Sequence, residues 1–293
     1  MNNNQKKLFD GVIIVSDLDG TYIDDNSKQV LSNTRKIEYF KQNGGSFTFA
    51  TGRALSALTI AIANLKEICN FPAILCNGSY IYDIEKDEKI SEIFLNKQKA
   101  YKLIKTIIEK FPDIGCRITI DDYQVCPTTC SLLEAEKEKY KSLVYKHSTL
   151  DEIYNLNWSK CVFVGQNEQL QKLQRFAMEK DDPDFTFCFS SSHLYEILAK
   201  GATKGDRLKD LKKCSNSQNP IIFAIGDQEN DIAMLEKADF AACPSNAIEY
   251  VKQIPGIIKV CSNNQGAICG LIEDIENNIN IYNQVIEKQS TLA

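Results

Sequence analysis

The chain has 293 residues, of which 43% are hydrophobic and 25% charged, an ordinary composition for a globular protein. Its formal net charge of −5 argues against a nucleic-acid partner, because nucleic-acid-binding surfaces carry an excess of Lys and Arg. No apolar stretch is long enough to cross a bilayer, and residues 1–10 lack the apolar centre of a secretory signal. We therefore expect a soluble, cytoplasmic protein with no membrane partner, and the sequence says nothing of its oligomeric state.

The 11 cysteines do not predict a metal site or a disulfide framework. They are scattered, and most lie inside apolar runs, where a free cysteine behaves as a small hydrophobic residue. Cys126 and Cys130 form the one close pair, and the two histidines, His147 and His193, do not complete a zinc pattern with it.

The first part of the chain alternates apolar strand patterns with helical ones. We expect a buried strand over 11–17, a helix over 32–45, a strand over 46–52, a helix over 54–68 and a strand over 71–83, with a hairpin turn inside the last. This β-α-β-α-β order predicts a parallel sheet with crossover helices.

The middle of the chain has a different pattern. Helices are expected over 96–111 and 167–180, and two short strands follow each of them. A charged helical stretch over 132–145 lies between these two units. The pattern predicts an α+β domain with an antiparallel sheet, inserted at about residues 84–190.

The first pattern returns after a turn and helix at 200–213, with a buried strand over 219–227 and a helix over 229–238. We therefore predict an α/β fold in which residues 1–83 and 191–293 form one domain. The inserted α+β domain, 84–190, forms the second.

Polar side chains follow three of the predicted parallel strands. Asp17 and Asp19 follow the first strand, Thr51 the second and Asp227 a late one, while Lys204 stands where a helix begins. Each has a simpler explanation by itself, as a turn former, a helix cap or a solvated charge. Because ligands bind outside the carboxyl ends of such strands, their joint occurrence favours a functional site.

The residue types restrict the chemistry of this site. Carboxylates grouped without histidine or thiolate favour a hard cation, and Mg²⁺ suits one or two carboxylates together with a phosphate. The cation would also reduce the repulsion among Asp17, Asp19 and Asp227. A lysine, a threonine hydroxyl and free backbone N–H groups beside it would hold a phosphate. The set therefore predicts nucleophilic phosphoryl transfer.

In this order the motifs resemble those of haloacid dehalogenase (HAD) superfamily phosphatases, of the Cof-type subfamily IIB. The matching stretches are DLDGT (17–21), FATGR (49–53), GATKGDRL (201–208) and GDQENDIAML (226–235), and PAILCNGSYIYD resembles the stretch ahead of that subgroup's cap domain. The resemblance covers the whole chain. It implies a Rossmann-like parallel-sheet core with an inserted α+β cap domain.

The resemblance also implies residue roles. Asp17 would be the nucleophile that forms an aspartyl-phosphate, and Asp19 the general acid and then the general base. Mg²⁺ would be held by Asp17, the backbone carbonyl of Asp19 and Asp227, with Asp231 in or beside this group. The phosphate would be held by Leu18, Thr51, Gly52, Lys204 and Asn230.

These inferences predict a Mg²⁺-dependent phosphomonoesterase acting on a small phosphorylated metabolite, such as a sugar phosphate or a nucleotide-derived phosphate. A phosphosugar mutase stays open as an alternative. It should need cationic groups in the cap domain, and the cap arginines Arg117 and Arg175 lie in unrelated sequence contexts.

Two alternatives come from other classes. A receiver-like, phosphate-accepting signalling protein is shorter, has no inserted domain and needs no second carboxylate at Asp19. A metal-binding protein that has lost catalysis is disfavoured because no motif residue is missing. One segment, AACPSNA (241–247), departs from the family pattern, and we interpret it as a turn and helix cap in preference to a ligand contact.

Overall fold

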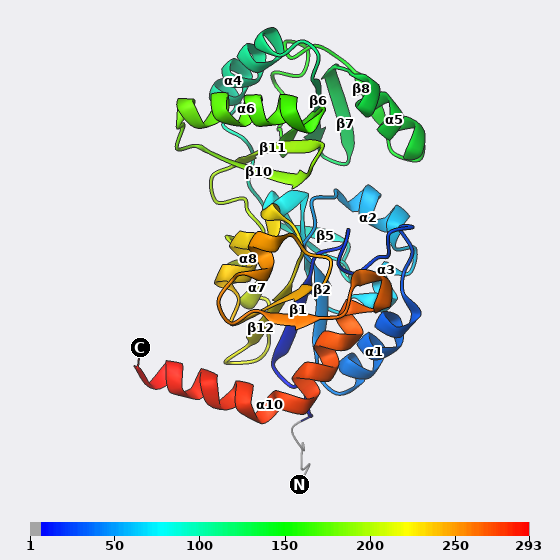
Figure 1. Ribbon diagram of the computed structural model, residues 1–293, viewed down its shortest axis with the longest axis vertical. Helices are drawn as coiled ribbons and strands as arrows, with labels where there is room; N and C mark the ends of the chain where they lie inside the picture. The colour runs from blue at the N-terminus through cyan, green and yellow to red at the C-terminus, as the bar shows by residue number, and fades with distance from the viewer. Residues whose placement is uncertain (1–6, 293) are drawn as a thin grey trace.

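The computed structural model describes residues 7–292, with side chains described for 7–287 (Figure 1). Its main sheet has five parallel strands in the order β14-β13-β12-β1-β2. These strands are β1 (Val12–Ser16), β2 (Ser46–Phe49), β12 (Ile221–Ile225), β13 (Phe240–Pro244) and β14 (Ile258–Val260). The sheet confirms the predicted α/β fold class.

Helices cover both faces of the main sheet, so its inner strands are apolar on both sides. Val12 and Ile14 of β1 pack into one hydrophobic cluster, while Ile13 and Val15 pack into another. The helices around this sheet are α1 (Leu31–Gln42), α2 (Leu55–Ala61), α3 (Leu65–Ile68), α7 (Leu208–Lys212), α8 (Ile232–Lys237), α9 (Glu249–Lys252) and α10 (Ala267–Leu292). Three single 3₁₀ turns are η1 (Cys76–Gly78), η2 (Glu229–Asp231) and η3 (Asn263–Gln265).

A small antiparallel sheet lies beside the main one. It consists of β3 (Ala73–Leu75), β4 (Tyr80–Asp83) and β5 (Glu88–Glu92). The hairpin turn expected inside 71–83 is present at η1, but the segment is not a member of the five-stranded sheet. A single parallel bridge between Ala50 and Ile74 connects it to the end of β2.

The middle of the chain forms a six-stranded sheet in the order β10-β11-β9-β6-β7-β8. Its strands are β6 (Gly115–Ile120), β7 (Tyr123–Thr128), β8 (Tyr145–His147), β9 (Lys160–Val164), β10 (Phe185–Ser191) and β11 (Leu194–Ala199). Helices α4 (Lys97–Lys110) and α6 (Asn167–Lys180) lie on the face turned away from the main sheet, and α5 (Ser131–Lys139) lies near the β8 edge (Figure 1). The pairing of β7 with β8 is parallel and the other pairs are antiparallel.

Strand pairing differs from the expected boundaries of the inserted segment. Strand β11, which the expected limit at residue 190 leaves outside, pairs with β9 and β10. Strand β5, which the expected start at residue 84 takes inside, pairs with β4. The buried residues of the main cluster in the six-stranded part all lie between Leu95 and Ala202.

Two of the expected helices also differ from the observed ones. The helix expected over 54–68 is interrupted, because Ile62 and Asn64 leave helical backbone geometry between α2 and α3. The helix expected over 132–145 ends at Lys139, and Tyr145 instead begins the edge strand β8.

Within the described part of the chain, no helix is both long and apolar enough to span a membrane.

Candidate active site

The predicted residues meet at the carboxyl ends of three adjacent strands, β12, β1 and β2. Asp17 follows β1, is 6% exposed, and donates its backbone N–H to the carbonyl of Ile225 at 2.9 Å. Thr51 lies just beyond β2 and Asp227 just beyond β12, and both are buried. Parallel pairing of these strands therefore places residues that are far apart in sequence around Asp17.

Lys204 places its ammonium group directly against Asp17. The side chain is fully buried, and its Nζ lies 2.5 Å from Asp17 Oδ1 and 2.6 Å from Asp231 Oδ1. Burial acts to lower the pKa of Lys204, but the two carboxylates outweigh burial and raise that pKa above its ordinary value. Lys204 is therefore a fixed positive charge beside the proposed nucleophile.

Three buried carboxylates form the one group among the described residues with the spacing of a metal site. One oxygen from each of Asp17, Asp227 and Asp231 lies within 4.8 Å of the others. Burial, followed by the nearby Asp231, raises the pKa of Asp17 well above its usual range and that of Asp227 to about 7. Lys204 supplies one positive charge for three acids, and the all-oxygen donor set fits a hard divalent cation such as Mg²⁺.

Asp231 also holds the loop that carries Asp227. Its Oδ2 accepts the backbone N–H groups of Asp227 and Gln228, both at 3.0 Å. Its Oδ1 is already in contact with Lys204, so both carboxylate oxygens have partners. This arrangement favours Asp17 and Asp227 as direct cation ligands, with Asp231 orienting them.

The turn after β1 fits closely around Asp227. Thr21 Oγ1 donates to Asp227 Oδ1 at 2.9 Å. Gly20 has φ +80°, and a Cβ at this position would lie 2.5 Å from Asp227 Oδ2. The glycine of DLDGT is therefore required by both its backbone conformation and the nearness of the carboxylate. No role was predicted for Thr21 from the sequence.

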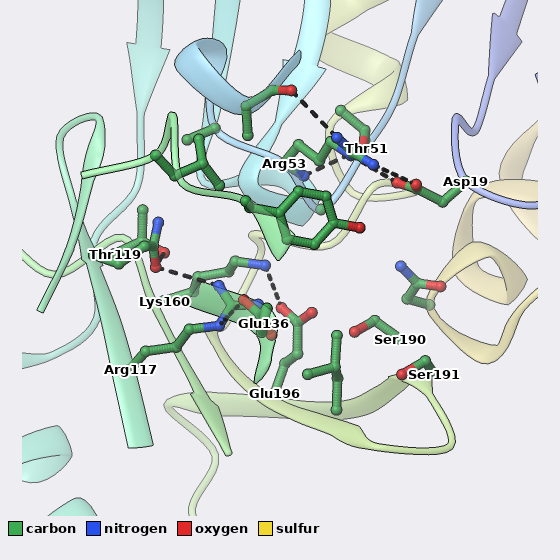
Figure 2. A pocket seen from close by; sticks show the side chains of 18 of the residues that line it. Asp19, Thr51, Arg53, Arg117, Thr119, Glu136, Lys160, Ser190, Ser191 and Glu196 are labelled. Carbon is green, nitrogen blue, oxygen red and sulfur yellow. Dashed lines mark hydrogen bonds and ion pairs between the residues drawn. The ribbon is translucent and has the colours of Figure 1, made fainter. Parts of the chain in front are cut away.

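Asp19 lies at the mouth of the site and is paired with Arg53. Arg53 Nε donates to Asp19 Oδ2 at 2.8 Å and Nη2 to Oδ1 at 2.5 Å (Figure 2). The Arg53 guanidinium also lies 5.8 Å from the ring centroid of Tyr140 in the six-stranded part. Arg53 was not among the predicted site residues, although its position in FATGR, two residues after Thr51, was a usable signal.

Three of the predicted phosphate ligands, Thr51, Gly52 and Asn230, line the same cavity as Asp17. Thr51 Oγ1 accepts the Arg53 N–H at 3.2 Å, which leaves the hydroxyl hydrogen for an acceptor in the cavity. Asn230 Nδ2 donates to Asn77 Oδ1 at 3.1 Å. The cavity is lined on this side by Asp17, Asp19, Thr51, Gly52 and Asn230. Leu18 is buried in the turn between the two aspartates.

The cavity extends from Asp17 to the six-stranded sheet and has a volume of about 440 Å³. Its far side carries two ion pairs: Lys160 Nζ lies 2.6 Å from Glu196 Oε2, and Arg117 Nε lies 3.2 Å from Glu136 Oε1 (Figure 2). Arg175 does not line the cavity. Lys160 and Glu196 were not among the predicted site residues, and their signal in the sequence was a charged residue inside an otherwise apolar strand pattern.

The AACPSNA segment braces the DLDGT turn. Asn246 Nδ2 donates to the carbonyl of Gly20 at 2.8 Å, and Asn246 Oδ1 accepts the N–H of Asn263 at 2.9 Å. The expected turn is present, since the Ala247 N–H bonds to the carbonyl of Pro244. The expected helix cap is wrong, because the residue that precedes α9 is Ile248.

The match to known proteins agrees with this geometry. Residues 14–272 match the model of the haloacid dehalogenase-like hydrolase family. The chain belongs to this family, and it is a phosphatase of the Cof-type subfamily IIB.

Relatives of different stated activities match most of the chain. A Bacillus subtilis 5-amino-6-(5-phospho-D-ribitylamino)uracil phosphatase is 25% identical over 286 residues, covering 89% of this chain and 97% of the relative. The Escherichia coli pyridoxal phosphate phosphatase is 25% identical over 276 residues, covering 84% and 92%. The solved structure of a HAD subclass IIB sugar phosphatase superposes with a TM-score of 0.76 at 17% identity, covering 90% and 98%. Because these names differ in substrate, family membership indicates a small phosphorylated substrate without naming it.

Proposed function

We propose that this protein is a Mg²⁺-dependent phosphomonoesterase that hydrolyses a small phosphorylated metabolite through an aspartyl-phosphate at Asp17. The observation that supports this most is the placement of Asp17. It stands at the end of the inner strand β1, in contact with the Lys204 ammonium and close to Asp227 and Asp231. Asp17 and Asp19 line the same cavity, which the proposed nucleophile and general acid must share.

In the first step an Asp17 carboxylate oxygen attacks phosphorus, the ester P–O bond breaks, and the leaving oxygen takes a proton from Asp19. In the second step Asp19 removes a proton from water, whose oxygen attacks the same phosphorus and releases Asp17 and inorganic phosphate. Bound Mg²⁺ would neutralise the negative charge that gathers between the carboxylates and the phosphoryl oxygens. Asp17, the Asp19 carbonyl and Asp227 would hold it, with Asp231 beside them.

The remaining groups would hold the phosphoryl oxygens. In this proposal the Thr51 hydroxyl, the Asn230 amide, the Lys204 ammonium and the backbone N–H groups at Leu18 and Gly52 are the donors. Arg53 bonds to both carboxylate oxygens of Asp19, so it must release at least one of them before Asp19 can contact a leaving group.

We also propose that the six-stranded part, from about residue 94 to 200, acts as a cap domain over this site. These limits replace the expected 84–190, because β5 pairs with β4 and β11 pairs with β9. The cap would supply the contacts to the leaving group across the cavity of about 440 Å³.

The ion pairs of Lys160 and Arg117 favour a phosphatase over a mutase, although a third cation of this side, Lys139, also lines the cavity. Lys160 and Arg117 each have a carboxylate partner, Glu196 and Glu136. A mutase must hold a second phosphate there, and the charge of these two cations is already balanced. The cytoplasmic location stays a prediction from the sequence.

The test is a panel of phosphorylated metabolites assayed with Mg²⁺ and with EDTA. The proposal predicts release of inorganic phosphate from at least one compound with Mg²⁺ and none with EDTA. Hydrolysis that EDTA leaves unchanged would contradict the Mg²⁺ part, and no hydrolysis of any compound would contradict the whole.

A further inference from the structure

The side-chain amide of Asn77 connects the two parts of the molecule. Asn77 lies in η1, is 1% exposed and has φ +59°, a conformation that asparagine adopts more readily than most residues. Its Nδ2 donates to Glu196 Oε2 of β11 at 2.8 Å. Its Oδ1 accepts from Asn230 Nδ2 of η2 at 3.1 Å. One amide therefore bridges the six-stranded sheet and the carboxyl end of the main sheet.

On the β11 side the amide meets a charged acceptor. Glu196 and Lys160 are 2% and 3% exposed, and Lys160 Nζ lies 2.6 Å from the same Oε2 that Asn77 contacts. Burial acts to raise the pKa of Glu196, but Lys160 outweighs it and lowers that pKa, so the carboxylate is ionised. A hydrogen bond to an ionised acceptor is stronger than a neutral one, which fixes the orientation of the Asn77 amide.

On the other side the same residue supports the phosphate ligands. The Asn77 N–H donates to the carbonyl of Thr51 at 2.9 Å. A Cβ at Gly52 would lie 3.2 Å from Asn77 Oδ1, so the Thr51-Gly52 turn packs against the amide. Asn77 accepts one of the two amide hydrogens of Asn230, which leaves the other for a phosphate oxygen.

Two flanking contacts show that η1 is a junction between the two parts. Ser79 Oγ donates to the carbonyl of Ser159, which precedes β9, at 2.8 Å. Gly78 has φ +123°, and a Cβ there would lie 2.5 Å from the carbonyl oxygen of Thr203, the residue before Lys204. The turn is therefore in contact with the six-stranded part and with the segment that carries Lys204, and it has no room for a larger residue at Gly78.

We propose that Asn77 is a positioning residue that makes phosphate binding by Asn230 and Thr51 depend on the six-stranded sheet being in place. The inference rests on the proposed function, which assigns those two residues to the phosphate. When Glu196 is against η1, the Asn77 amide is fixed and holds Asn230 toward the cavity. When the sheet moves away, the charged acceptor is lost and the phosphate is held less tightly.

The experiment measures binding of inorganic phosphate to the full-length protein in Mg²⁺ by calorimetry, with KM and kcat for p-nitrophenyl phosphate beside it. Asn77→Asp keeps the acceptor for Asn230 but turns a carboxylate toward Glu196. We expect phosphate to bind at least about fivefold more weakly, which is the lower end of ordinary coupling between sites. KM should rise with it, whereas a merely structural role would lower the thermal midpoint and leave the phosphate affinity of the folded protein unchanged.

The second substitution tests the link to the cap. Glu196→Gln in the Asn77→Asp background supplies an amide to the introduced carboxylate and should restore most of the lost phosphate affinity. Glu196→Gln alone should change that affinity by less than the rescue that it produces, so the double-mutant cycle is not additive. An additive cycle, or wild-type phosphate affinity in Asn77→Asp, would overturn the inference.

Two further variants, a second test at Asn77 and a control at Asp121, complete the experiment. Asn77→Gly keeps the left-handed backbone without strain and removes both side-chain bonds, so it should also weaken phosphate binding, and wild-type affinity would overturn the inference. Asp121→Gly changes another left-handed residue, at φ +48° in the turn between β6 and β7, and should bind phosphate as the wild type does. Wild-type protein that neither binds phosphate nor hydrolyses the ester would contradict the proposed function itself, whereas an active wild type with an additive cycle would contradict the inference alone.

Discussion

Asparagine is a near-isostere of the proposed nucleophile but cannot attack phosphorus. Asp17→Asn should therefore remove phosphatase activity while the fold persists. It should also relieve the crowding of three buried acids, since burial and Asp231 raise the pKa of Asp17. Activity assays and circular dichroism on the purified variant check both points. Turnover near the wild-type rate would rule out Asp17 as the nucleophile.

Substitution of Asp19 should have a different effect from substitution of Asp17. Asp19→Asn should keep Mg²⁺ binding, because the proposed contact is the backbone carbonyl. It should slow turnover by roughly a hundredfold or more, the usual size of lost acid–base catalysis. A substrate with a good leaving group needs no acid, so its first step should recover while hydrolysis stays slow. Normal turnover of all substrates by this variant would contradict the acid–base role.

At the level of single residues, the sequence predicted the site residues at the strand ends but not the side chains that contact them. Asp17, Thr51 and Asp227 could be found because the carboxyl ends of adjacent parallel strands meet at one edge. Arg53 and Asn77 could not be assigned, because their roles depend on which side chain each one faces across the fold. Such pairings are set by tertiary packing, so the position of Arg53 two residues after Thr51 could mark it as a site residue but not show that it faces Asp19.

The turn that follows β1 gives a matched test of close packing. Gly20 and Gly201 both have φ +80°, but only Gly20 lies against another group, Asp227. Gly20→Ala and Gly201→Ala should share a similar backbone strain, about 1 kcal/mol of unfolding free energy. Gly20→Ala should additionally displace Asp227 and weaken Mg²⁺ binding. Calorimetric Mg²⁺ titrations of the two variants compare them, and equal affinities would contradict the proposed place of Asp227 in the site.

Secondary structure followed the sequence where one pattern ran without interruption. Helix α6 begins and ends where the amphipathic pattern of 167–180 does. The 71–83 segment was misassigned to the main sheet because a buried parallel strand and a buried hairpin strand have the same apolar pattern. The 191–199 segment was placed on the wrong side of the expected boundary because strand pairing, which groups β11 with β9, is not a local property.

Bound Mg²⁺ should stabilise the whole molecule, because the three carboxylates are brought together only in the folded state. At a hundredfold excess over its dissociation constant the cation should add about 2.7 kcal/mol to the free energy of unfolding. Thermal melts with Mg²⁺ and with EDTA measure this, and Asp227→Asn should lose most of the difference. An unchanged melting temperature in saturating Mg²⁺ would speak against a cation at this site.

Removal of the proposed cap should abolish substrate selectivity but leave slow catalysis. The buried side chains of the six-stranded part cluster separately from those around the main sheet, so replacement of residues 94–200 by a Gly/Ser linker should leave the core folded. After circular dichroism has confirmed folding, we expect slow Mg²⁺-dependent hydrolysis of p-nitrophenyl phosphate and no discrimination among natural substrates. A folded capless protein with the selectivity of the full chain would place specificity in the core.

The covalent intermediate is the most direct test of the account. Asp19→Asn, mixed with p-nitrophenyl phosphate and Mg²⁺ and quenched in acid within the first turnover, should accumulate phosphate on one peptide. Mass spectrometry should locate it on the side chain of Asp17, in an amount equal to the burst of p-nitrophenol. A burst of p-nitrophenol without a phosphorylated peptide, or with the phosphate on another residue, would contradict the assignment of Asp17 as the nucleophile.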